Sequence, residues 1–126
     1  MDDRERLHDR IKEAIYYNPA RIGLPKQYLL SKSMEVGLIH NGETIVVPDI
    51  RYDYRNGREY TYFVEVKSSN SRKCREKGNI QVQKIISWTY EHEINAKVFL
   101  IYPERRTRNF KRILEQLIVE EHQGNW

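Results

Sequence analysis

Cysteine is nearly absent from this chain of 126 residues, in which Cys74 is the single example. One cysteine excludes an internal disulfide, and it also excludes zinc or iron–sulfur sites that need several thiolates. No apolar run approaches the ~20 residues that span a membrane. The charged first residues also lack the apolar stretch of a signal peptide. We therefore expect no membrane partner and an intracellular, cytoplasmic location.

Repeats, low-complexity tracts and flexible linkers are also lacking, so the sequence predicts one domain over residues 1–126. Hydrophobic residues make up 39% of the chain and charged residues 32%, which is the balance of a globular rather than a disordered protein. A chain of this length can bury a modest core of two or three layers.

Positive charge is in mild excess and is unevenly distributed. The net charge of +4 permits a polyanionic partner without requiring one. We interpret two basic clusters as candidate nucleic-acid contacts, with ordinary solubilising charge as the alternative. These residues are Arg72, Lys73, Arg75 and Lys77 in the first cluster, and Arg105, Arg106 and Arg108 in the second.

Hydrophobic periodicity predicts an α/β chain, more closely an α+β fold in which helices flank a mixed sheet. We expect a first helix from Asp2 or Asp3 to about Tyr17, and two tight turns at Asn41-Gly42 and Asn56-Gly57 that join antiparallel strands. The expected order is α-β-β-β-α-β-α. The later elements are strands at 34–40, 44–54, 59–68 and 96–102, and helices at 79–92 and 107–121.

Three charged residues interrupt otherwise apolar strands. Asp49 follows Val47-Pro48, and Glu65 and Lys67 alternate with valines in the next strand. Side chains two residues apart share a face of a strand, so Glu65 and Lys67 project together, and the turn between the strands brings Asp49 beside them. Carboxylates suit Mg²⁺ or Mn²⁺, and an ammonium beside them stabilises charge on a phosphate. The desolvation cost of such charges favours this interpretation over a merely solvated strand face.

This strand order, with Asp49 and Glu65-Val66-Lys67 at these positions, resembles the PD-(D/E)XK nuclease superfamily, which has the restriction-endonuclease-like fold. The likeness covers most of the chain, from the first helix to the fourth strand. Within the superfamily, the chain most resembles RecB-type nucleases, and its small size also suits archaeal Holliday-junction resolvases and compact viral nucleases. The resemblance implies hydrolysis of phosphodiester bonds in nucleic acid with Mg²⁺ or Mn²⁺, inside the host cell if the chain is viral.

The resemblance also implies roles for further residues. His8 would add a metal ligand, as would the carbonyl of Val66, alongside Asp49 and Glu65. Glu35 matches a glutamate at the start of the first strand. The family's glutamine on the following helix matches either Gln81 or Gln83, and these residues leave the choice open.

Several alternatives remain open in the sequence. DNA is the favoured substrate and RNA the main rival, because the Pro-Asp and histidine pattern also resembles viral cap-snatching RNA endonucleases. A nucleic-acid-binding module without catalysis and an assembly subunit are hypotheses from other classes. A homodimer is a further alternative, since a two-stranded substrate favours one.

Overall fold

A five-stranded mixed sheet with helices on both faces forms the protein in this computed structural model, which describes residues 2–126. The sheet order is β1-β4-β5-β6-β7, and β5 and β6 are the parallel pair within it. This confirms the predicted mixed α+β fold. The elements are α1 (Asp3–Tyr17), η1 (Pro19–Ile22), β1 (Leu29–Met34), β2 (Leu38–His40), β3 (Glu43–Val46), β4 (Ile50–Arg55), β5 (Glu59–Val66), α2 (Arg72–Glu91), β6 (Ala96–Pro103), α3 (Phe110–Glu115) and β7 (Leu117–Gln123).

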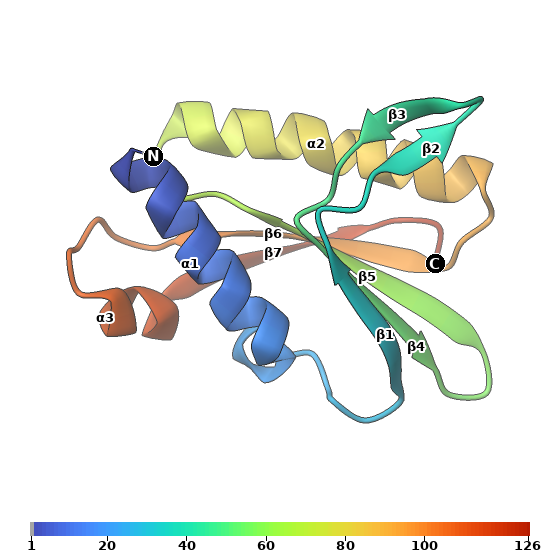
Figure 1. Cartoon of the computed structure of the whole chain (residues 1–126), viewed down its shortest axis with the longest axis horizontal. Helices are drawn as coiled ribbons and strands as arrows, with labels where there is room; N and C mark the ends of the chain where they lie inside the picture. Colours follow the sequence, from blue (N-terminus) through green and yellow to red (C-terminus); the bar gives the residue numbers. More distant parts are fainter. Residues whose placement is uncertain (1) are drawn as a thin grey trace.

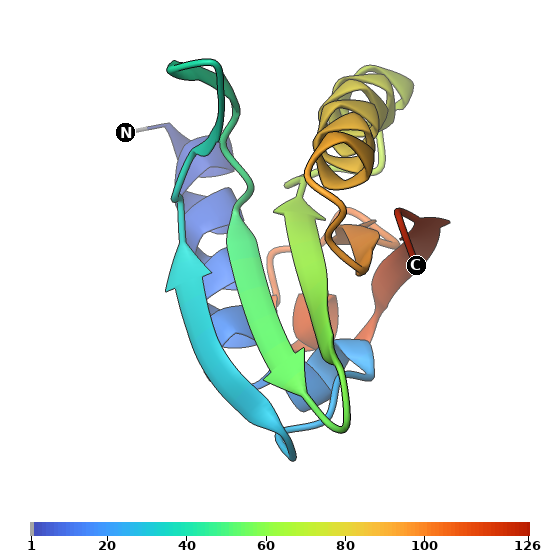
Figure 2. The ribbon, with the colours of Figure 1, turned by 90° about the vertical axis from the view of Figure 1, so that its right-hand side faces the viewer.

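Helices α1 and α2 cover opposite faces of the sheet (Figures 1 and 2). Residues alternate between the faces along β5: Val64 packs in the cluster that includes Ile11 of α1, and Phe63 packs in the cluster that includes Val82 of α2. Residue i of a strand and residue i+2 share a face, so Glu65 lies on the α2 face. Burial of these apolar side chains on both faces is the main term that stabilises the sheet.

The first helix follows its sequence signals closely. The Asp2 side chain accepts a hydrogen bond from the Glu5 N–H and caps α1, and the helix ends at Asn18, before Pro19. A side-chain oxygen at this position satisfies one of the free N–H groups of the first turn. The predicted helix over about residues 2–17 is therefore confirmed.

A short hairpin of β2 and β3 stands apart from the main sheet (Figure 1). The turn at Asn41-Gly42 is present, but the strands that flank it pair only with each other. The prediction of main-sheet strands at 34–40 and 44–54 was wrong in this respect, since β1 ends at Met34 and β4 begins at Ile50. The backbone N–H of Glu35 donates to the Asp49 carbonyl at 3.1 Å, which closes the base of the hairpin.

Two further boundaries differ from prediction. Helix α2 begins at Arg72, so most of the segment expected to be a polar connection is helical, capped by the Ser71 side chain. The predicted closing helix over 107–121 was wrong: it divides into the short helix α3 and the edge strand β7, which pairs antiparallel with β6. Among residues 2–126, no helix is both long and apolar enough to cross a lipid bilayer.

Candidate active site

Asp49 and Glu65 meet where β4 begins and β5 ends. Ile50 pairs with Val64 in the antiparallel register, so the residues just beyond that pair lie side by side. The Asp49 N–H lies 3.2 Å from Glu65 Oε1, and the Val66 N–H donates to Asp49 Oδ2 at 2.7 Å. Each carboxylate is therefore held by the backbone of the other strand, which fixes their relative position.

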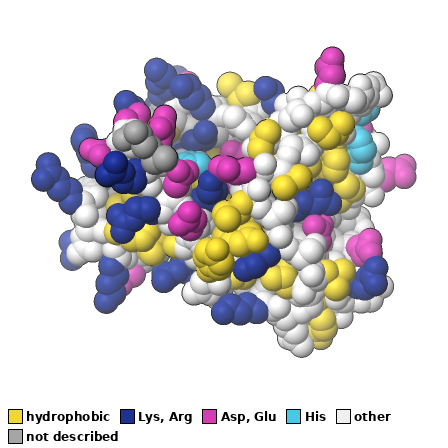
Figure 3. All heavy atoms as spheres, viewed as in Figure 1, with side chains coloured by type: hydrophobic (Ala, Val, Ile, Leu, Met, Phe, Trp, Pro, Cys, Tyr) yellow, Lys and Arg dark blue, Asp and Glu magenta, His cyan; other side chains and the backbone are white. Residues whose placement is uncertain are grey.

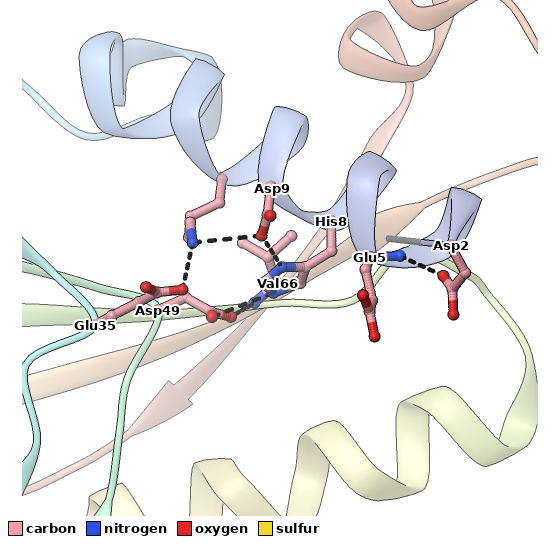
Figure 4. Close-up of polar contacts among 8 residues, drawn as sticks. Asp2, Glu5, His8, Asp9, Glu35, Asp49 and Val66 are labelled. Carbon is pink, nitrogen blue, oxygen red and sulfur yellow. Dashed lines mark hydrogen bonds and ion pairs between the residues drawn. The ribbon is translucent and has the colours of Figure 1, made fainter.

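His8 reaches this pair from α1 (Figure 4). Its Nε2 lies 3.2 Å from Asp49 Oδ1, and its Nδ1 lies 3.1 Å from Asp9 Oδ1. The hydrogen bond to Asp49 raises the pKa of His8 above its usual value, against a smaller opposing effect of burial. Two ligands at adjacent corners of an octahedral Mg²⁺ or Mn²⁺ site lie about 3 Å apart, which is close to the separation of His8 and Asp49.

Glu65 is 3% exposed and is one of few buried charged residues in the structure. Burial, and then the negative charge of Asp49, raises the pKa of Glu65 to about 8, although Lys67 acts in the opposite direction. A carboxyl group in this position holds its proton at neutral pH unless a positive charge binds beside it. Perturbed groups of this kind are concentrated at functional sites.

Lys67 extends from the end of β5 under α2. Its N–H donates to the Ile101 carbonyl of β6 at 2.8 Å, which fixes the backbone at the strand end. Its stem runs past Gly78, where an added Cβ would lie 3.3 Å from Lys67 Cγ and 2.6 Å from Leu100 Cδ1. Gly78 therefore leaves room for the lysine between helix and sheet. We refer to His8, Asp49, Glu65 and Lys67 together as the inner site.

The carbonyl of Val66 faces the same side of β5 as its own N–H. In an extended strand, the N–H and C=O of one residue point to one neighbour, and those of the next residue point to the other. Lys67 bonds to β6 and the Val66 N–H bonds to Asp49, so the Val66 carbonyl is directed toward the Asp49 side. The role of the Val66 carbonyl as a metal ligand stays a prediction.

A buried lysine, Lys12, lies in the same neighbourhood and was not predicted from the sequence. Lys12 is 6% exposed and pairs with Glu35, and its Nζ lies 3.5 Å from Asp9 Oδ1. Burial lowers its pKa, but the ion pairs with Glu35 and Asp9 outweigh that effect and raise it. Its position four residues after His8, on one helix face, was the available signal. Glu35 follows β1 rather than starting a strand, which corrects the expected placement.

The two candidate glutamines lie on different sides of α2. Gln81 is half-buried, one turn after Gly78, whereas Gln83 is exposed and lines a groove beside His40 and Ile45. Residues three apart on a helix share a face, so Gln81 lies nearer to the inner site than Gln83 does. No hydrogen bond within residues 2–126 joins either glutamine to Asp49 or Glu65.

Both basic clusters are exposed, but only the second lines a hollow, through Arg105 and Arg106. This hollow, here called the basic hollow, also receives Arg4 and the carboxylates of Asp2 and Asp3 from the start of α1. Lys and Arg side chains gather at this end of the molecule in Figure 3. Within the first cluster, Arg72 pairs with Glu76 at 2.8 Å, which reduces the charge that it offers to a ligand. Lys73, Arg75, Lys77 and Arg108 are exposed as well.

A second group of ligand-type side chains lies at the far end of α2. Among residues 2–126, the three side chains of this type whose donor atoms all lie within 4.8 Å of one another are His40, Glu91 and His92, here called the outer cluster. Among the described residues, His8, Asp49 and Glu65 do not meet this distance criterion, and Glu65 accepts a hydrogen bond from the Asp49 N–H. Glu91 and His92 are adjacent, but His40 is remote from them in the sequence, so no spacing motif could have found the cluster.

Comparison of the chain with protein-family models, with curated proteins and with solved structures gives no match.

Proposed function

We propose that the protein is a divalent-metal-dependent nuclease that hydrolyses phosphodiester bonds of DNA. The observation that carries this proposal is the junction of Asp49 and Glu65, in which each carboxylate accepts a backbone hydrogen bond from the other strand. His8 and Lys67 reach the same junction from α1 and β5. Two carboxylates and an imidazole can hold a divalent ion for this chemistry, and an ammonium can stabilise negative charge on the phosphate.

The donor set fits Mg²⁺ or Mn²⁺. Asp49, Glu65, His8 and the Val66 carbonyl would hold the ion, and hard oxygen donors are what both metals prefer. The high pKa of Glu65 reflects negative charge in a buried place, which a cation would relieve. When bound, the ion supplies Lewis-acid polarisation of the phosphate and a lower pKa for a nearby water.

Further side chains near the inner site orient the ligands and the substrate. Asp9 accepts a hydrogen bond from His8 Nδ1. This bond orients the ring so that Nε2 is directed at Asp49. Lys67 carries positive charge at the side where a phosphate would approach, and it stabilises the charge that develops during hydrolysis. Lys12 and Glu35 hold the base of the hairpin against α1. Gln81 is the better placed glutamine for orienting a phosphate or a water.

A polyanionic substrate agrees with the three arginines that line the basic hollow, which are Arg4, Arg105 and Arg106. These side chains, and the exposed basic residues at the start of α2, would contact phosphates. Such contacts contribute affinity but no sequence preference, so we expect weak base specificity.

The test is cleavage of plasmid DNA, single-stranded DNA and RNA by the purified protein with Mn²⁺, with and without a chelator. We expect metal-dependent cleavage of DNA that is lost in Asp49→Asn. Cleavage of RNA alone would change the substrate to RNA within the same chemistry. Metal-independent binding without cleavage of any substrate would instead establish a non-catalytic binding module.

A further inference from the structure

The outer cluster joins two elements that are separate in the sequence. His40 ends β2 at the tip of the hairpin, Glu91 ends α2, and His92 caps that helix. His40 Nδ1 lies 3.3 Å from Glu91 Oε2, and the rings of His40 and His92 have their centroids 5.4 Å apart. Donor atoms of a tetrahedral zinc site with bonds near 2.0–2.1 Å lie about 3.3 Å apart. The distance from His40 Nδ1 to Glu91 Oε2 already matches this separation.

The ring of His92 is oriented as metal-binding imidazoles usually are. Its Nδ1 lies 2.9 Å from the Trp88 carbonyl, and a carbonyl only accepts, so Nδ1 carries the proton. The lone pair is therefore on Nε2, which is free to bind. A backbone carbonyl that fixes the tautomer in this way is typical of the groups that support a metal-bound histidine. Stacking on the Trp88 ring, with centroids 4.3 Å apart, also limits rotation of His92.

The helix end beside the cluster favours a cation, although Lys84 lines the same groove. The last turn of α2 contains no basic residue, so no lysine or arginine balances the negative end of the helix. Glu91 adds a negative charge there and its side chain is 55% exposed, which leaves the donor atoms accessible from solution.

The position of the cluster gives a bound ion a structural effect. The hairpin is attached to α2 by buried Leu38 and Val46 near its base and by a hydrogen bond from Trp88 Nε1 to the Ile39 carbonyl at 2.9 Å. His40 lies beyond these contacts, next to the turn. An ion shared with α2 would therefore fix the outer end of the hairpin.

We propose that His40, Glu91 and His92 form a transition-metal site, with Zn²⁺ as its ion, that clamps the β2–β3 hairpin to the end of α2. Two imidazoles and one carboxylate suit Zn²⁺ rather than Mg²⁺, which prefers oxygen donors. The fourth position is left to water. This site is independent of the nuclease proposal, because it shares no residue with the inner site.

The experiment is titration of the full chain with Co²⁺ followed by Zn²⁺ competition, without a histidine tag. The background is Cys74→Ser/Asp49→Asn, which removes the inner site as a competing site for these ions. We expect one Co²⁺ per chain with visible absorption bands of low-coordinate cobalt, displaced by equimolar Zn²⁺, and a higher melting temperature with Zn²⁺. His40→Gln and His92→Gln should each weaken Zn²⁺ binding by at least ~100-fold. Loss of a residue that only hydrogen-bonds to a metal ligand costs about 10- to 100-fold, and loss of a ligand itself should cost no less.

The matched control in this background is His122→Gln, which replaces a half-buried histidine on β7. It should bind Zn²⁺ as its parent does. Histidine ring NMR signals give a second measurement, in which Zn²⁺ should shift the signals of His40 and His92 and leave those of His8 and His122 in place. If no Zn²⁺ binds at metal concentrations up to about 100 µM, at which even a weak surface site would be partly occupied, the proposal is overturned. Equal binding by His40→Gln and His92→Gln, or shifts confined to His8, would do the same.

Discussion

The inner site and the outer cluster both combine carboxylates with imidazoles, but in opposite surroundings. Glu65 is 3% exposed and its pKa is raised to about 8, whereas the Glu91 side chain is 55% exposed. The inner carboxylates are held by backbone N–H groups of neighbouring strands, and the outer donors are on a helix end and a hairpin tip. Burial places a high electrostatic cost on the inner carboxylates, so they gain most from a bound cation.

The largest expected difference between the two regions is in the cleavage rate when a lysine of each is replaced. Lys67→Met should lower the cleavage rate by ~10²-fold, because loss of one charge-stabilising group costs about that much. Methionine keeps the packing of the stem against α2. Lys84→Met is the matched control, since Lys84 is exposed beside the outer cluster and its loss should leave the rate unchanged. Single-turnover kinetics measures both, and equal rates for wild type and Lys67→Met would remove Lys67 from the mechanism.

The basic hollow provides a second, smaller contrast. Replacing Arg105, Arg106 and Arg108 by alanine should weaken DNA binding ~10-fold and reduce the salt slope by roughly two, at 0.7 to 0.9 for each lost phosphate contact. Arg55→Ala with Arg58→Ala is the control, because these residues lie at the opposite end of β4 and β5. Fluorescence anisotropy at several salt concentrations gives both slopes. A salt-independent affinity, or the larger loss in the control, would place the binding surface elsewhere.

The smallest expected effect is a pH dependence of stability in metal-free protein. The folded pKa of Glu65 is raised from 4.5 to about 8, so the folded state binds the proton more tightly than the unfolded state. The resulting stability is complete below about pH 4.5 and is lost as pH rises toward 8. Glu65→Gln should flatten this decline and melt at a higher temperature than wild type at pH 8 with a chelator. Glu91→Gln should keep the wild-type slope, and an identical slope in all three proteins would contradict the buried, protonated Glu65.

Local patterns in the sequence were enough to predict the strand with Glu65 and Lys67 and its partner Asp49. Alternation of valines with charged residues defines which side chains share a face, and the turn at Asn56-Gly57 sets the pairing. These signals act between neighbours in the chain. The first helix was predictable for the same reason, since its cap and its terminating proline are local.

Other features depend on contacts that the sequence pattern does not contain. Ile113, Leu117 and Ile118 have helical spacing, yet the chain leaves the helix at Gln116 because Leu117 to Gln123 pairs with the exposed edge of β6. Tertiary pairing overrides local periodicity in such cases. Lys12 was overlooked because its burial is explained by Glu35, 23 residues away. The outer cluster likewise joins positions about fifty residues apart.

The most direct test of the account compares two double variants in Mn²⁺-dependent cleavage of DNA under single-turnover conditions. Asp49→Asn/Glu65→Gln removes both inner carboxylates, and His40→Gln/His92→Gln removes both outer imidazoles, with circular dichroism to verify folding. The account predicts a loss of at least ~10²-fold for the inner variant, and a rate within about threefold of wild type for the outer one, because the outer ion clamps the hairpin and does not touch the substrate. Wild-type cleavage by the folded inner variant would contradict the assignment of hydrolysis to Asp49 and Glu65.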